Sequence, residues 1–460
     1  MSRSLCHTLL GEILTGLKIF FTFSSGCPSE HLEHQPVFSE KIPKLYNTNF
    51  TIDMKHAFCI FLLVLSINGF GQNANIDHLK FATAPTIDSF DYAKELKDMA
   101  TSARIIGMGE ATHGTAEFEE IKTEIVKTLV LQYHYRHLIL EASLAQCRAL
   151  NEYICSGQGN AEFVLASYVS WPFSTSGFVH MLDWLKDYNK NKSAQEQVHF
   201  YGCDIQGSRA LNAMRWELNK FHKISGYNDT VLLCQLEEIK GSEKEKQDGY
   251  QNLLQQYSAK KYATAIDSIS AINMIESQIC YNISHGGKRY GYRELLLFQY
   301  AQYHIQSLSP QEKVMIWAHN GHISKHSTHR KSLGAYLSEA YKDEYKAIGF
   351  EFNKGSFRAS AIDSSKVKSN LIDFRVGENP QTLGAILSAN NKGILGIDIG
   401  VNTHHPLITE NQVINDVGAV YSYITAKKEN FYTEKIKLKR SFDYLFIVDE
   451  MHPTKGIQFK

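Results

Sequence analysis

A glutamate and a histidine stand three residues apart in a glycine-rich turn. Glu110 follows Gly107-Met108-Gly109, and His113 precedes Gly114 and an amphipathic run. A neutral imidazole can take a proton from water near physiological pH, and a carboxylate on its second nitrogen would fix the tautomer and stabilise the imidazolium. We therefore expect Glu110 and His113 to do acid–base chemistry, with His113 as the base.

Three later apolar runs also end in polar side chains. These side chains are Glu141, Asp204 with Gln206, and His319 with His322. The carboxyl ends of parallel strands meet at one edge of a sheet, so we expect these groups to converge on the first pair. Such a set supports the activation of water. The chain contains no Gly-x-Ser-x-Gly elbow, which favours direct attack by water over an acyl-serine intermediate.

The elements that would position these residues alternate between strand and helix. Apolar runs predict strands at residues 105–106, 137–142, 198–206, 313–318, 345–352, 393–399 and 442–448. Helical spacing predicts helices at residues 92–99, 115–133, 144–154, 178–188 and 333–341. This alternation predicts an α/β fold with a mainly parallel central sheet that is flanked by helices.

A long stretch in the middle of the chain is almost entirely helical in pattern. It runs from 208 to 310, with a charged break at 241–249. We expect an inserted helical subdomain here that forms one wall of a cleft. The α/β catalytic core would then comprise residues 76–207 and 311–455.

The composition argues for a compact fold and a small partner. In 460 residues, 48 Lys and Arg balance 48 Asp and Glu, so there is no basic surplus to bind nucleic acid. We expect a small neutral or amphipathic ligand instead. No CxxC, HExxH or EF-hand motif occurs, which predicts no cofactor and gives no strong metal site.

The N-terminal part resembles an export signal that does not start at the first residue. Met54-Lys55-His56 precedes the short apolar run 57–70, which is followed by Gly71-Gln72. This pattern predicts a signal peptide at 54–71, with export to the periplasm or outside the cell. The run is too short to span a bilayer, so no stable membrane insertion is expected after cleavage. Residues 1–53 would be disordered or lie upstream of the true start at Met54.

Simpler structural roles stand beside these functional ones. The glycines could serve only a tight turn, and Glu110 could be a carboxylate that favours a helix start. Trp171, next to Pro172, could line a substrate pocket or pack in the core. Cys203, beside Asp204, is better explained as core filling than as a nucleophile.

Six segments, in this order and spacing, resemble the erythromycin esterase family. They are GMGEATHGTAEF, LILEAS, WPFSTSGFVHMLDWLKDYN, FYGCDIQG, YRELLL and VMIWAHNGHIS, all between residues 104 and 352. The most specific are GEATHG and WAHNGH. The resemblance implies a metal-independent hydrolase that opens a macrolide lactone with a His-activated water.

The resemblance also implies roles for individual residues. The implied catalytic residues are His113 as base, Glu110 and Glu141 as its acidic neighbours, and His319 with His322 as a second imidazole pair. The residues expected to bind substrate are Arg293, Lys122, Trp171 and Asp204. Lys122 stands where the family commonly has an arginine. Lysine keeps the positive charge but lacks the planar guanidinium that can make two parallel hydrogen bonds.

These inferences predict an exported esterase that acts on a small ester or lactone. Two alternatives use the same cluster. One is a metal-dependent hydrolase in which Glu110, His113 and His319 or His322 hold a divalent ion. The other is a non-catalytic protein that binds a small molecule or a metal and releases it unchanged.

Overall fold

The computed structural model describes residues 76–205, 230–262, 265–283, 286–327, 330–363, 366–426 and 432–457. The chain divides into two units, and all described residues belong to the second, Ile76–Lys460. The predicted signal peptide, the segment before it and Gln206 lie outside the described residues.

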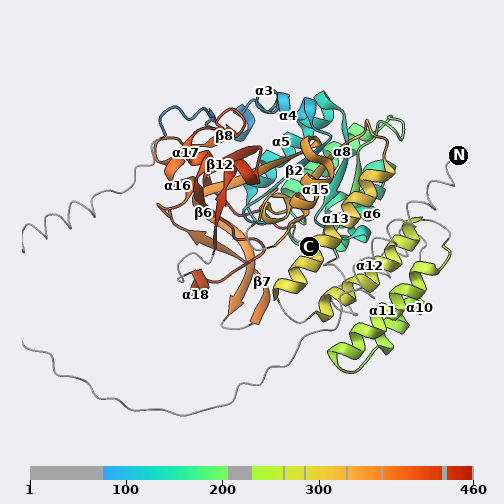
Figure 1. Ribbon diagram of the computed structural model, residues 1–460. Coiled ribbons are helices and arrows are strands. Elements are labelled where there is room, and N and C mark those ends of the chain that lie inside the picture. Colours follow the sequence, from blue (N-terminus) through green and yellow to red (C-terminus); the bar gives the residue numbers. More distant parts are fainter. Residues whose placement is uncertain are drawn as a thin grey trace, which may run out of the picture. The chain divides into compact units, whose positions relative to one another are not determined.

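A ten-stranded sheet forms the centre of this described unit (Figure 1). Its strands follow the order β1-β8-β12-β6-β2-β5-β3-β4, and β7 and β10 also pair with β6. Their bounds are β1 Ala82–Ala84, β2 Ile105–Met108, β3 Tyr135–Leu140, β4 His199–Gly202, β5 Lys313–Trp317, β6 Tyr345–Asp363, β7 Lys366–Val376, β8 Ile394–Asp398, β10 Val420–Tyr421 and β12 Tyr444–Met451. A separate antiparallel pair joins β9 (Asn411–Asn415) to β11 (Thr433–Lys437).

Most neighbours in the large sheet are parallel. The pairs from β12 through β6, β2, β5 and β3 to β4 all run in the same direction. The pairs β1–β8, β8–β12 and β6–β7 are antiparallel. The structure therefore confirms the predicted α/β fold with a mainly parallel sheet.

Helices connect and cover these strands. Before β5 they are α3 Tyr92–Glu95, α4 Lys97–Ser102, α5 Ala116–Tyr133, α6 Leu144–Ser156, α7 Ala161–Tyr168, α8 Ser176–Asn189, α10 Thr230–Glu238, α11 Glu243–Ala259, α12 Ala265–Asn282 and α13 Gly286–Ser307. After β5 they are α14 Asn320–Ile323, α15 Leu333–Tyr341, α16 Leu383–Ser388, α17 Pro406–Thr409, α18 Tyr423–Ala426 and α19 Leu438–Ser441. Short 3₁₀ turns occur at Ile87–Ser89 and Lys342–Glu344. None of the helices in the described ranges is long and apolar enough to cross a bilayer.

Local sequence explains where the long helices near the sheet begin and end. The side chains of Ser143 and Thr175 cap α6 and α8 by accepting backbone N–H groups. Helix α6 ends at Gly157, whose φ of 70° lies in the left-handed region that glycine adopts without strain. Helix α5 has acidic residues in its first turn, which favour the positive end of the helix dipole.

The helices that follow β4 have their own apolar core. Side chains of α10, α11 and α12 pack together there, including Leu236, Leu253 and Ile275. Helix α13 contacts both α12 and β4, and it also packs against α15. It therefore links this helical region, which corresponds to the described part of 208–310, to the sheet.

Strand β6 is much longer than the predicted run at 345–352. It is buried on both faces from 347 to 353, which gives the mainly apolar run seen in the sequence. Beyond it, buried and half-buried residues alternate, and the strand forms an antiparallel hairpin with β7. A half-exposed strand has a weaker apolar signal, and the prediction ended where that signal changed.

Two glycines give opposite predictions for substitution by alanine. A Cβ at Gly114, beside the candidate base, would lie 1.9 Å from the carbonyl oxygen of Arg358, whereas one at Gly291 within α13 would meet no atom within 4 Å. We expect Gly114→Ala to lower the free energy of unfolding by about 1–3 kcal/mol. Gly291→Ala should raise it by about 0.5–1 kcal/mol, because alanine is the better helix former. Denaturant unfolding of both variants measures these changes, and equal shifts would contradict the packing described at Gly114.

Candidate active site

Glu110 and His113 form a hydrogen-bonded pair in the turn between β2 and α5. Nδ1 of His113 donates to Oε1 of Glu110, which leaves Nε2 of the ring to accept a proton. The backbone N–H of His113 donates to Gly418 O at 3.3 Å and so fixes the turn. Only 13% of the His113 side chain and 8% of the Glu110 side chain are exposed. The pair therefore has the geometry of a base that a carboxylate orients.

A buried lysine and a tryptophan hold the second oxygen of Glu110. Lys122 on α5 donates to Oε2 through Nζ, and Trp317 at the end of β5 donates its Nε1–H to the same oxygen at 3.3 Å. The ammonium also lies 4.1 Å from the centre of the Trp317 ring, a cation–π contact. Lys122 is fully buried, and its ammonium contacts the site through Glu110.

The pKa values of this pair follow from burial and contact. Burial alone would raise the pKa of Glu110, but the charge of Lys122 and the hydrogen bond from His113 lower it to about 2. Burial would lower the pKa of His113, but the hydrogen bond and charge of Glu110 raise it above the ordinary value of 6.5. Glu110 is therefore ionised at neutral pH and stabilises the imidazolium that forms when His113 takes a proton.

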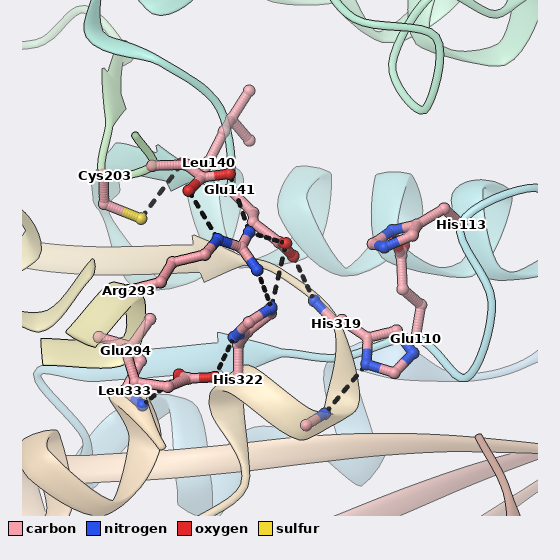
Figure 2. Close-up of polar contacts among 12 residues, drawn as sticks. Glu110, His113, Leu140, Glu141, Cys203, Arg293, Glu294, His319, His322 and Leu333 are labelled. Carbon is pink, nitrogen blue, oxygen red and sulfur yellow. Dashed lines mark hydrogen bonds and ion pairs between the residues drawn. The ribbon is translucent and has the colours of Figure 1, made fainter. Parts of the chain in front are cut away.

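Arg293 on α13 joins the groups that follow two other strands. Its Nε and Nη2 donate to Oδ1 and Oδ2 of Asp204 at 2.9 and 2.8 Å, in the bidentate geometry that favours a strong pair. Nη2 also donates to Oε1 of Glu141 at 2.7 Å. Figure 2 shows the guanidinium of Arg293 beside Glu141. The carboxylates of Glu141 and Asp204 follow β3 and β4. Arg293 and Asp204, both predicted to bind substrate, thus contact each other.

His322 lies between two carboxylates. Its Nε2 is 3.1 Å from Oε1 of Glu141, and its Nδ1 is 2.8 Å from Oε1 of Glu294. Burial would lower the pKa of His322, but the charges of Glu141 and Glu294 raise it to about 10. Glu294 also accepts a hydrogen bond from Nε of Arg330 at 2.9 Å. Nη1 of Arg293 lies 3.1 Å from Nε2 of His322, and its charge opposes the rise in the pKa of His322. The two carboxylates together outweigh it and favour a charged imidazolium at neutral pH.

His319 has a different environment and faces His113. Their ring centroids are 5.3 Å apart (Figure 2). His319 caps α14, and its Nδ1 accepts the backbone N–H of Gly321 at 3.2 Å. An accepting Nδ1 carries no proton, so the neutral ring holds its proton on Nε2, which is 3.3 Å from Ala111 O. Burial lowers the pKa of His319 and keeps the ring neutral, although Asp416 opposes this effect.

Positive and negative groups balance in this buried network. Its carboxylates are Glu110, Glu141, Asp204 and Glu294, and its cations are Lys122, Arg293, His322 and Arg330. Direct pairing offsets the cost of removing these charges from water. The groups left free to change protonation are then the two facing imidazoles, His113 and His319.

Two other predicted residues lie beside the network. The half-buried ring of Trp171 meets the His113 ring edge-on, with centroids 6.4 Å apart. This contact places the ring of Trp171 beside the candidate base. Cys203 is buried and its Sγ donates to Leu140 O at 3.3 Å, while burial raises the pKa of its thiol well above the usual value. It fills the core, as expected.

The carboxylates and imidazoles of the site are also residue types that bind metal ions. In the described ranges, no group of three or more His, Cys, Asp or Glu residues is placed to hold a metal ion. The carboxylates that such a site would use are paired with cations, Glu110 with Lys122 and Glu141 with Arg293. An ion here would have to displace these buried contacts.

The patterns used above do not single out four further residues of the site. They are Trp317, Asn320, Glu294 and Asp416. The first three stand inside the segments VMIWAHNGHIS and YRELLL, next to residues that were singled out. Asn320 pairs its side-chain amide with the backbone N–H and C=O of Phe350, at 3.1 and 2.6 Å, and so fixes the turn after β5. Asp416 lies outside the six segments, beyond residue 352.

Comparison with known proteins agrees with this fold. A solved structure of a mutant of erythromycin esterase EreC in its open conformation matches with a TM-score of 0.60 and 16% identity, covering 83% of this chain and 100% of that one. Erythromycin esterase type II of Escherichia coli is 22% identical over 325 residues, which are 60% of this chain and 76% of that protein. YbfO of Bacillus subtilis (strain 168) is 20% identical over 406 residues, or 78% and 86% of the two chains.

The fold and the site define an α/β protein whose polar site lies at the carboxyl ends of parallel strands. The family model for erythromycin esterase matches residues 130–451. The chain therefore belongs to the erythromycin esterase family. Membership supports assignment as a hydrolase of the esterase class that acts on a small molecule.

Proposed function

We propose that this protein hydrolyses a carboxylic ester or macrolactone by direct attack of a water that His113 activates. The observation that carries the proposal is the Glu110–His113 pair, in which a carboxylate holds Nδ1 and leaves Nε2 to act as base. His319 faces His113 as a neutral ring, with its N–H on Nε2, 3.3 Å from Ala111 O. Trp171 lies against the base and would form part of the substrate pocket.

The reaction would proceed in two steps. The water oxygen bonds to the carbonyl carbon while Nε2 of His113 takes one of its protons, and Glu110 stabilises the imidazolium. The tetrahedral intermediate then breaks its C–O bond, and His113 returns the proton to the leaving alkoxide. The products are an acid and an alcohol, and no covalent bond to the protein forms. Lys122 and Trp317 hold Glu110 in place throughout.

A hydrolysis screen tests this proposal. The panel comprises macrolides and simple aryl esters, with the His113→Asn variant as the reference for background hydrolysis. Mass spectrometry would show addition of one water to the substrate. Turnover that depends on His113 supports the proposal, whereas a panel without turnover, or equal rates for both proteins, would overturn it.

The pH dependence gives a second check. His113 must be neutral to accept a proton, and its pKa is raised, so kcat/KM should fall as pH drops through a midpoint above the ordinary 6.5. The contacts that raise the pKa come from Glu110, so Glu110→Gln should move this midpoint to lower pH. Rate profiles of both proteins measure the shift. An unchanged or higher midpoint in the variant would contradict the pairing.

Export is part of the proposal. The segment at 54–71 has the order of a signal peptide, a short basic start followed by an apolar run. A hydrolase outside the cytoplasm would meet its ester substrate before the substrate enters the cell. N-terminal sequencing of the mature protein tests this point.

A further inference from the structure

Asp416 presents a carboxylate oxygen without a hydrogen-bond partner to the site. Its Oδ1 atom is buried, and no described residue is placed to hydrogen-bond to it. The atom lies 3.2 Å from Nε2 of His319, an ion-pair distance. Buried acceptors in native proteins are nearly always satisfied by protein or by ordered water. A donor from outside the protein would therefore satisfy this oxygen.

The backbone around Asp416 is fixed to the turn that carries the base. Val417 N donates to Ala111 O at 2.7 Å, two residues before His113. On the other side, Asn415 donates its backbone and side-chain N–H groups to the buried Glu351 on β6, at 2.8 and 2.6 Å. Oδ1 of Asp416 is thus attached to an anchored segment, which is the condition for precise positioning of a reactant.

We propose that Asp416, His113 and His319 together bind the nucleophilic water. Nε2 of His113 accepts the O–H whose proton is transferred, and Oδ1 of Asp416 accepts the other O–H. The Nε2–H of His319, which lies 3.3 Å from Ala111 O, is shared between that carbonyl and the water oxygen as a three-centre hydrogen bond. Three partners are typical of a well-bound water in a protein. The inference rests on the proposed function, in which water is the nucleophile.

This arrangement assigns each atom of the water a place in the reaction. One proton moves to His113 and later to the alkoxide. The second hydrogen stays on the oxygen, hydrogen-bonded to Asp416, while that oxygen forms the new bond to the carbonyl carbon. With both hydrogens held, a lone pair of the oxygen points away from the two acceptors and towards the substrate. Asp416 takes no proton, and its effect is orientation of the reacting oxygen.

The surroundings of Asp416 provide a matched control. Glu434 on β11 is another acidic residue near it, and burial, assisted by the charge of Asp416, raises the pKa of Glu434 to about 7. In this assignment Glu434 does not touch the water. Glu434→Gln should therefore change kcat by less than about twofold, on the scale expected for a residue outside the reacting groups.

Substitution of Asp416 tests the assignment by kinetics. Asp416→Ala should lower kcat by about 10- to 100-fold, because the water loses its orientation, while KM changes by less than about twofold. Asp416→Asn keeps an oxygen that accepts a hydrogen bond and should retain more activity than the alanine variant. A merely structural role predicts the same loss for both variants together with a lower unfolding midpoint. Wild-type kcat in Asp416→Ala would overturn the inference.

A crystal structure of the free protein tests it without any substrate. At a resolution that shows ordered water, one molecule is expected within hydrogen-bond distance of the three named atoms, and it should be lost in Asp416→Ala. A protein donor on Oδ1, or the same water in the variant, would overturn the assignment. If no ester is hydrolysed, the proposed function fails while these structures still decide the water site. If hydrolysis needs His113 but not Asp416, this inference alone fails.

Discussion

Replacing His113 with asparagine is expected to lower kcat for ester hydrolysis by about 10²- to 10⁴-fold, the range that a general base contributes. Asparagine cannot take a proton at neutral pH, so the attacking water would remain un-ionised. The Glu110 carboxylate and its contact with Lys122 do not depend on the imidazole, so the fold should persist. Initial rates at saturating substrate, with circular dichroism as a folding control, measure the effect.

His180 offers a matched control for this experiment. It is an exposed histidine on α8 and lies outside the polar network. His180→Asn should leave kcat unchanged, which separates loss of the base from a general effect of removing an imidazole. A His113 variant that retains near wild-type kcat would remove the assignment of the base, whatever the control shows.

Replacing Arg293 with methionine is expected to lower the free energy of unfolding by about 3–5 kcal/mol, since breaking a buried ion pair leaves an uncompensated charge. Arg293 donates to both Asp204 and Glu141, and 9% of its side chain is exposed. Removal leaves two buried carboxylates without their shared cation, and Glu141 also holds the backbone N–H of His319 at 2.9 Å. We therefore expect lower activity together with lower stability.

Arg289, one turn earlier on α13, separates the ion pair from the helix itself. Its guanidinium bonds to the carbonyl oxygens of Ile283 and Tyr281 and not to the carboxylates of the site. Arg289→Met should cost much less than Arg293→Met when both are unfolded in urea. Equal losses would show that the effect comes from helix α13 and not from the buried charges.

The parallel strands were predictable because a strand that is buried on both faces has a nearly continuous run of apolar residues. Residues 314–318 and 138–140 are continuously apolar and are followed by polar residues, and the structure places β5 and β3 there. The β6–β7 hairpin was not predicted, since half-exposed strands mix polar and apolar residues. Helix α7 was likewise missed, in a region where glycines at 157 and 159 indicate only a loop.

The candidate site also has a part that the sequence predicts and a part that it does not. Glu110, His113, Glu141 and His319 follow strands that are neighbours in the sheet, so sheet topology alone brings them together. The sequence predicts the same role for His319 and His322. In the structure, His319 caps a helix in its neutral form, whereas His322 lies between two carboxylates. That difference depends on Glu294 and Arg293 from a helix distant in sequence. Asp416 comes from a connection after β9, which carries no motif.

The central claim is that an activated water attacks the ester directly. One turnover in water labelled with the heavy oxygen isotope, with enzyme in excess over the best ester of the panel, tests it most directly. The account predicts one labelled oxygen in the acid product and none in the protein, with a turnover about 10²- to 10⁴-fold slower in His113→Asn. An unlabelled acid, with the label in Glu110 or Glu141 after that single turnover, would contradict it.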